Sequence, residues 1–282
     1  PWIPFYKKTL EFDSVSSKFN LSDSIYSKSF SNQFPHIVAK NVFLHKQYPD
    51  TILKQVIFSD LLEKDQYCYS DLGYYIFKEI IERKYEKKLN EISDSLFYKR
   101  LGMENLGFLP LNNIDVDRII PTEFDSDFRG QLLQGYVHDM GAAMQGGVGG
   151  HAGLFSNTND LAKLMQMYLN NGIYGDEYYF SKEIVSEFTR RQFSSNENRR
   201  GAGFDKPVLA NQEGGPASQN AGLYSFGHSG FTGVLAWADP EVNLIYIFLS
   251  NRIHPNAKNK KLLDMNVRTE IMKIIYENID EK

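Results

Sequence analysis

The stretch Tyr224–Asn251, YSFGHSGFTGVLAWADPEVNLIYIFLSN, decides the fold because it carries three successive strand patterns. Short runs of aliphatic and aromatic residues lie around YSFGHSGF, GVLAWAD and NLIYIFLSN, and turn residues separate them. The turn DPEVN between the last two runs suits an antiparallel hairpin. We therefore predict three antiparallel strands, with further strands of the same sheet upstream of Pro1, because three are few for a chain of this size.

Outside this stretch the periodicity is mainly helical. Apolar residues recur at helical spacing, and small polar residues or glycines stand at the ends of the segments. Residues 13–34 are rich in Ser and Asn and predict a loop, and the glycine-dense residues 135–153 predict a tight connection with close backbone approaches. The predicted helices are 48–62 (apolar stripe Ile52, Leu53, Val56, Ile57), 69–89 (stripe Leu72, Tyr75, Ile76, Ile80, Ile81, with Ser70 and Asp71 as caps), 90–102, 158–170, 181–192 and 260–279.

Length and charge limit the class of protein. The 282 residues carry a formal charge of −4 without a run of Lys or Arg, which argues against a nucleic-acid partner. No apolar window of about 18 residues predicts a membrane span, and the single Cys68 allows no internal disulfide. We predict an α/β (α+β) chain with one domain over residues 1–282. A helical region covers about 40–190, and the sheet and C-terminal helix cover about 222–280.

Three clusters of side chains are candidates for chemistry, and the first is Tyr69-Ser70-Asp71. A Tyr two residues before a carboxylate, at the start of a helix, presents a phenol and a carboxylate side by side. The alternative is a structural role, in which the aromatic ring is a hydrophobic staple and the polar residues cap the helix. Taken alone, these residues favour the structural role.

The second cluster is His228-Ser229-Gly230. A glycine on an edge strand lets a ligand approach the backbone, and the imidazole offers a donor on the same rim. The alternative is a core histidine with satisfied hydrogen bonds.

The third cluster is His138-Asp139 together with His151 across the glycine-dense segment. His and Asp are zinc ligands, but the adjacent pair lacks the i, i+4 placement of a helical two-His site. We therefore predict no metal and no other cofactor, and expect these residues to hold the glycine segment by hydrogen bonds.

Together the motifs resemble the serine β-lactamase and penicillin-binding-protein family, in its class C and esterase-like branch. The resemblance rests on YSD opening a helix, GGVGGHAGLFSNTNDLAKLM (Gly146–Met165) in the middle and GHSG on a late strand. It implies a β-lactamase/transpeptidase-like fold, an antiparallel sheet flanked by helices plus a helical region. Similar sequences follow a family 3 glycoside hydrolase of the β-N-acetylglucosaminidase type in bacterial proteins, so an N-terminal glycosidase domain is an implied partner.

The family's chemistry is acyl transfer through a serine ester, in which the Ser of Ser-x-x-Lys attacks a carbonyl and the Lys and a Tyr manage the proton. The resemblance gives the Tyr role to Tyr69, places Asp71 at the usual Asn and makes His228 a wall of the site. It makes Ser229, Gly230 and Phe231 substrate-binding residues, with the Phe231 N–H in the oxyanion hole. The implied substrate is an ester or a muropeptide-like D-amino-acid peptide, and the implied location is the periplasm or cell envelope.

Two departures from the family pattern matter. Asp71 adds a negative charge beside Tyr69, which would raise the pKa of the phenol. No Ser has a Lys three residues on, and only Thr51–Lys54 has that spacing, within an ordinary amphipathic pattern. We expect the nucleophile helix and N-terminal strands to lie upstream of this chain, which begins without Met. The 282 residues alone are then inactive, and the apolar surface exposed by the missing helix favours self-association. The alternative is an inactive ligand- or wall-binding module attached to a glycosidase.

Overall fold

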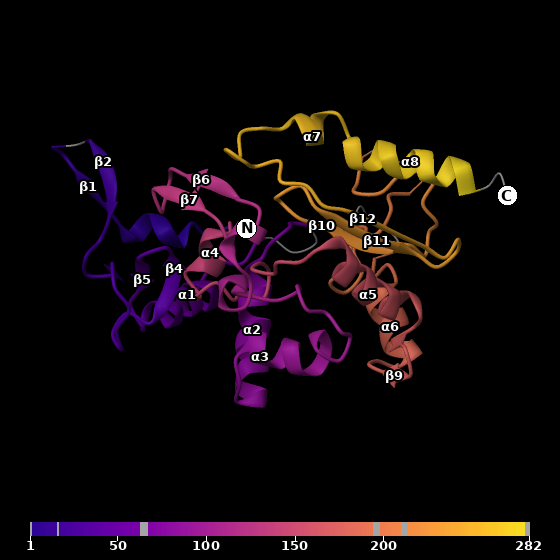
Figure 1. Ribbon diagram of the computed structural model, residues 1–282, viewed down its shortest axis with the longest axis horizontal. Helices are drawn as coiled ribbons and strands as arrows, with labels where there is room; N and C mark the ends of the chain where they lie inside the picture. The colour runs from indigo at the N-terminus through magenta and orange to yellow at the C-terminus, as the bar shows by residue number, and fades with distance from the viewer. Residues whose placement is uncertain (1, 16, 63–66, 194–197, 210–213, 280–282) are drawn as a thin grey trace. The chain divides into compact units, whose positions relative to one another are not determined.

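The computed structural model describes residues 2–15, 17–62, 67–193, 198–209 and 214–279 (Figure 1). The chain forms two compact units. Unit 1 comprises Pro1–Leu96, Gly107–Phe155 and His254–Asn256, and unit 2 comprises Phe97–Leu106, Ser156–Ile253 and Ala257–Lys282.

Unit 2 is built on the three predicted strands, which the structure confirms. They are β10 (Phe226–Ser229), β11 (Leu235–Asp239) and β12 (Leu244–Phe248), antiparallel and hydrogen-bonded in the order β10-β11-β12. The predicted hairpin joins β11 to β12, and Asn243 adopts φ 52° in its turn. Asn tolerates this left-handed conformation better than most residues, which explains its place in the turn.

The two faces of this sheet pack against different helices, as Figure 1 shows. Leu235, Trp237 and Tyr246 lie with Met272 and Tyr276 of α8 (Val267–Ile279) in one buried cluster. Phe226 and Ala238 lie with Met165 of α5 (Thr158–Leu169) in another. Because side chains alternate along a strand, His228 projects from the same face as Phe226, the face that α5 covers.

Two helices of unit 2 each begin at a polar residue whose side chain caps the helix N-terminus. The Asn157 side chain accepts the Asp160 N–H at 2.9 Å and begins α5, and Ser181 begins α6 (Lys182–Thr189) in the same way. The predicted single C-terminal helix is wrong in one respect. It is divided into α7 (Lys261–Asp264) and α8 because Asn266 adopts φ 50° between them. The short strands β8 (Ile173–Tyr174) and β9 (Glu177–Tyr178) form a small hairpin after α5.

Unit 1 consists of short strands and helices around one buried cluster that includes Leu44, Ile52, Leu133 and Met144. The predicted loop over residues 13–34 is wrong in part, because β2 and β3 lie within it and pair with neighbouring strands. The elements are η1 (Phe5–Thr9), β1 (Leu10–Asp13), β2 (Lys18–Leu21), β3 (Tyr26–Ser27), β4 (His36–Ala39), β5 (Val42–Leu44), α1 (Tyr48–Ile57), α2 (Leu72–Tyr85), α3 (Leu89–Ser93), η3 (Pro110–Asn112), η4 (Val116–Arg118), β6 (Glu123–Asp125), β7 (Gln131–Leu133) and α4 (Met140–Ala143). The π-helical turn η2 (Asp94–Tyr98) runs from unit 1 into unit 2.

Helices α1 and α2 form where the periodicity predicts them, but their apolar stripes are only partly buried. Ile52 and Val56 of α1 are buried, whereas Ile57 is 57% exposed. In α2 the one buried side chain is Tyr75, and Ile80 is 54% exposed. The position of α2 in unit 1 therefore depends heavily on Tyr75.

A buried ion pair organises the β6–β7 hairpin. Arg129 Nε lies 2.5 Å from Asp125 Oδ2, and both side chains are at most 1% exposed. The guanidinium also donates to the carbonyls of Val137 and His138, each at 2.7 Å. The hairpin thereby fixes the backbone just before Asp139.

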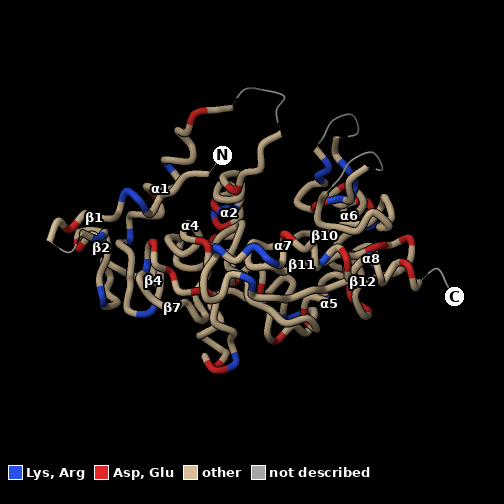
Figure 2. Tube along the Cα trace, turned by 90° about the horizontal axis from the view of Figure 1, so that it is seen from above, with Lys and Arg blue, Asp and Glu red and all other residues tan. Residues whose placement is uncertain are grey.

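Charges of both signs are interspersed along the trace in Figure 2. Within the residues that the structure describes, no helix is long and apolar enough to cross a bilayer.

Candidate active site

Tyr69 and Asp71 lie at the start of α2 in unit 1. The Tyr69 side chain is 54% exposed. Asp71 occupies the N-cap position, but its carboxylate makes no capping hydrogen bond, and the Leu72 N–H is instead bonded to the Ser70 hydroxyl at 3.2 Å. Of the two predicted caps, only Ser70 acts through its side chain. The Asp71 carboxylate is consequently not engaged in holding the helix end.

The glycine-dense segment is held much as its residues suggest. His151 Nε2 lies 2.9 Å from Asp139 Oδ1, which also accepts the Ala142 N–H at 2.7 Å and begins α4. His138 belongs to a different pair, because its Nδ1 is hydrogen-bonded to buried Glu123. The expected hydrogen-bonded role is confirmed for Asp139 and His151. In the described ranges, no group of three or more His, Cys, Asp or Glu is placed to hold a metal ion.

These bonds affect the ionisation of Asp139 and Tyr75. Burial opposes the charge on Asp139, but the hydrogen bonds from His151 and Ala142 outweigh burial and lower the pKa of this carboxyl. Burial raises the pKa of Tyr75, and the charges of Asp139 and Asp71 raise it further. Tyr75 therefore keeps its proton near neutral pH. The resemblance gives the role in proton transfer to the exposed Tyr69 instead.

His228 is held at both ring nitrogens. Nδ1 lies 2.8 Å from the Ser229 carbonyl oxygen, and Nε2 lies 2.8 Å from Arg200 Nη1. A guanidinium only donates, so the tautomer that satisfies both contacts carries its hydrogen on Nδ1 and accepts at Nε2. The cation at this rim is consequently Arg200, and the imidazole orients it.

Arg200 belongs to a cationic cluster that none of the three sequence motifs indicates. The cluster comprises Arg191, Arg199, Arg200 and Lys206. Arg199 Nε lies 2.6 Å and Arg200 Nη1 lies 3.4 Å from the buried carboxylate of Asp205. Lys206 is 2% exposed and donates to the Tyr224 carbonyl at 2.9 Å. Arg199 and Arg200 share the Asp205 carboxylate, whereas the carboxylates of Asp239 and Glu241 act on Lys206. In the sequence, the pair Arg199-Arg200 shortly before Asp205 is the one sign of this cluster. No motif fixes the spacing between that pair and His228.

Burial first, and then the charge of Arg191, lower the pKa of Lys206 to about 8, against smaller opposing effects of Asp239 and Glu241. Unfolded chains hold this proton up to about pH 10.4, so they bind more protons than the folded state above pH 8. The free energy of unfolding should therefore rise between about pH 8 and 10. We expect Lys206→Met to remove this rise in urea titrations and the exposed Lys182→Met to retain it. Parallel pH profiles for the two variants would contradict the assignment.

The turn after His228 is tight and supported by arginines. The Gly230 N–H donates to the Val234 carbonyl at 2.9 Å, and Gly233 adopts φ 104°. A Cβ on Gly230 would lie 2.6 Å from a methyl carbon of Val234, so a side chain there would require Val234 to move. The Arg252 guanidinium lies 4.6 Å from the centre of the 60% exposed Phe231 ring. The backbone of the predicted substrate-binding residues is therefore well supported.

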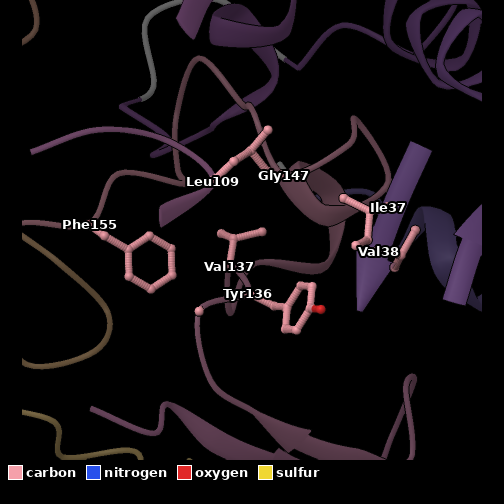
Figure 3. Close-up of a pocket in the computed structure, with 8 residues that line it drawn as sticks. Ile37, Val38, Leu109, Tyr136, Val137, Gly147 and Phe155 are labelled. Carbon is pink, nitrogen blue, oxygen red and sulfur yellow. The ribbon is translucent and has the colours of Figure 1, made fainter. Parts of the chain in front are cut away.

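A small apolar pocket lies within unit 1 (Figure 3). Its lining includes Val38, Tyr136, Val137 and Phe155, and none of the predicted site residues contributes to it. It is a feature of the unit 1 core.

The fold and these motifs define a β-lactamase-related class of protein, and the sequence comparison gives the family. Residues 53–266 match the β-lactamase family, and the chain belongs to that family. The matched residues include α2, the glycine-dense segment and β10. The predicted β-lactamase/penicillin-binding-protein resemblance and β-lactamase/transpeptidase-like fold are confirmed.

The chain is similar to a Salmonella gallinarum protein named "Putative D-alanyl-D-alanine carboxypeptidase", with 34% identity over 247 residues. The match covers 82% of this chain and 56% of that protein, so the chain spans about half the length of such relatives. Two solved structures share the fold at 16% identity each. Simvastatin synthase from Aspergillus terreus has a TM-score of 0.55, and the match covers 96% of this chain and 74% of that protein. A β-lactamase from Mycobacterium bovis has a TM-score of 0.51, and the match covers 75% of this chain and 64% of that protein.

Proposed function

We propose that the protein is a serine hydrolase or transferase that cleaves D-amino-acid peptides ending in a carboxylate, or related esters. The observation that carries the proposal is the contact of Arg200 with the motif strand β10, where Arg200 Nη1 lies 2.8 Å from His228 Nε2. Membership in the β-lactamase family and the names of the curated relatives support it. We propose cell-wall peptides as the substrates and, on that basis, the periplasm or cell envelope as the location.

The proposed roles follow the family chemistry. Tyr69 exchanges the proton of the attacking serine, and Asp71 holds a cation beside it. The Phe231 N–H stabilises the oxyanion, while Ser229 and Gly230 line the extended substrate. No Ser of the 282 residues has a Lys three positions on, so we place the nucleophile in sequence upstream of this chain.

Arg200 sets the preference for a carboxylate. Hydrogen bonds to charged groups contribute about 1.5–3 kcal/mol, so Arg200→Met should lower kcat/KM for an acyl-D-Ala-D-Ala peptide about 10- to 100-fold. The peptide's C-terminal amide should lose less than about threefold, since it cannot make the charged bond. The kinetics are measured on the chain extended upstream through its Ser-x-x-Lys.

Arg190→Met is the matched control, because Arg190 is 51% exposed at the side chain and pairs with Glu187 on α6. Arg190→Met should leave kcat/KM unchanged for both the acid and the amide peptide. Equal losses on the acid and amide peptides in Arg200→Met would overturn the carboxylate assignment.

A second candidate is a ligand- or wall-binding module attached to a glycosidase. The absence of Ser-x-x-Lys in these residues favours it. The module would bind the same peptides through the cationic cluster without turnover. A gene that encodes no upstream Ser-x-x-Lys would select this reading.

A further inference from the structure

We propose that Tyr75 is a positioning residue, wedged between Gly141 and His151, that fixes the first turn of α2 and with it the placement of Tyr69 and Asp71. The placement is a property of unit 1 alone. Its consequence for catalysis rests on the proposed function.

The start of α2 has one side-chain cap, the Ser70 hydroxyl, which accepts the Leu72 N–H at 3.2 Å. Asp71 makes no side-chain capping bond, and the first turn is otherwise closed by the Tyr74 N–H donating to the Asp71 carbonyl at 3.0 Å. Such an end frays unless tertiary contacts hold it. Tyr75, on this same turn, is the one buried side chain among the residues of α2 and is 6% exposed.

Tyr75 is enclosed on several sides. Its ring stacks on the His151 ring, with the ring centroids 4.6 Å apart and the planes at 19°. The centroid of the Phe5 ring lies 5.5 Å from that of Tyr75. A Cβ built on Gly141 would lie 1.9 Å from the Tyr75 hydroxyl oxygen and 3.2 Å from the ring carbon that bears it. Gly141 has no positive φ, so space rather than backbone conformation requires glycine here.

The glycine-dense segment also meets the backbone of this turn. A Cβ on Gly150 would lie 2.3 Å from the Tyr74 carbonyl oxygen. On the other side, His151 is held by Asp139, which begins α4. The contacts thus run from α4 through Asp139 and His151 to Tyr75, and the glycines at 141 and 150 let α2 approach.

The test is a double-mutant cycle in the 282-residue chain. Gly141→Ala places a methyl group on the Tyr75 hydroxyl, whereas Tyr75→Phe removes that oxygen and leaves a 3.2 Å contact. Gly141→Ala should speed hydrogen exchange of the Tyr74 amide about tenfold relative to the wild type, and the Tyr75→Phe/Gly141→Ala double variant should return it to within about threefold. Gly73→Ala is the matched control, since a Cβ there meets nothing within 4 Å and should not speed exchange.

Unchanged exchange in Gly141→Ala, or a double variant no better than Gly141→Ala, overturns the proposal. If Gly141→Ala loosens the whole chain, recovery in the double variant still decides the matter. A loss of packing with another cause would not be repaired by removing one oxygen from Tyr75.

The catalytic consequence is read from the labelling rate of a fluorophosphonate probe on the chain extended through its Ser-x-x-Lys. Gly141→Ala should slow labelling about tenfold, and the double variant should recover it. If Tyr69→Phe has no effect, the proposed function fails while the exchange result still stands. If Tyr69→Phe is inactive and Gly141→Ala labels normally, the positioning proposal fails instead.

Discussion

Tyr69→Phe is expected to lower the rate of acylation by a fluorophosphonate or an acyl-D-Ala-D-Ala peptide by about 10²- to 10⁴-fold. This is the usual contribution of a positioned acid–base group. The substitution removes the phenolic oxygen and keeps the ring, so packing at the start of α2 is preserved. The rate is measured by intact mass against time, on the chain extended upstream through the proposed Ser-x-x-Lys.

Tyr67→Phe provides the matched control for this prediction. Tyr67 lies two residues earlier in the same stretch and is 48% exposed, against 54% for Tyr69. Its loss should change the rate less than about threefold, since only a group in contact with the reacting atoms gains a catalytic effect. Equal rates for Tyr69→Phe and Tyr67→Phe would remove Tyr69 from the mechanism.

Arg129→Met should destabilise unit 1 by about 3–5 kcal/mol, the cost of breaking a buried ion pair. The substitution leaves the Asp125 carboxylate without its cation in a site that is 1% exposed. It also removes the donors to the Val137 and His138 carbonyls. The free energy is measured from the urea transition of the unit that contains the hairpin.

The comparison is with Arg190→Met, which breaks the exposed pair between Arg190 and Glu187 and should cost at most about 1 kcal/mol. Both variants remove an arginine paired within four residues, so the difference between them reports burial together with the lost hydrogen bonds to the Val137 and His138 carbonyls. A loss below about 1 kcal/mol in Arg129→Met would show that the network around Asp125 is not needed for stability.

The strands and most helices could be predicted because their signals are local. Short apolar runs and turn residues define β10 to β12, and caps such as Asn157 define where α5 begins. The break at Asn266 could not be seen, since the apolar periodicity continues across it. The periodicity of α2 also indicated a buried stripe, whereas burial depends on what packs against the helix, and of α2 only Tyr75 is buried.

The candidate site shows the same limit. Tyr69, Asp71 and His228 belong to contiguous motifs and could be proposed from the sequence. Arg200 lies 28 residues before His228 and is brought to it only by folding, so no spacing rule finds it. Tyr75 was assigned to a helix stripe, and its enclosure by Gly141 and His151 depends on contacts across 66 and 76 residues of sequence, which no local pattern encodes.

The central claim is that this chain carries the walls of a serine acyl-transfer site whose nucleophile lies upstream. Its most direct test is intact mass after incubation with a fluorophosphonate, for the 282-residue chain and for the same chain extended upstream through any Ser-x-x-Lys. The account predicts that the extended chain gains one probe and the short chain gains none. If both chains are folded and neither gains mass, the acyl-transfer account is contradicted and the binding module takes its place.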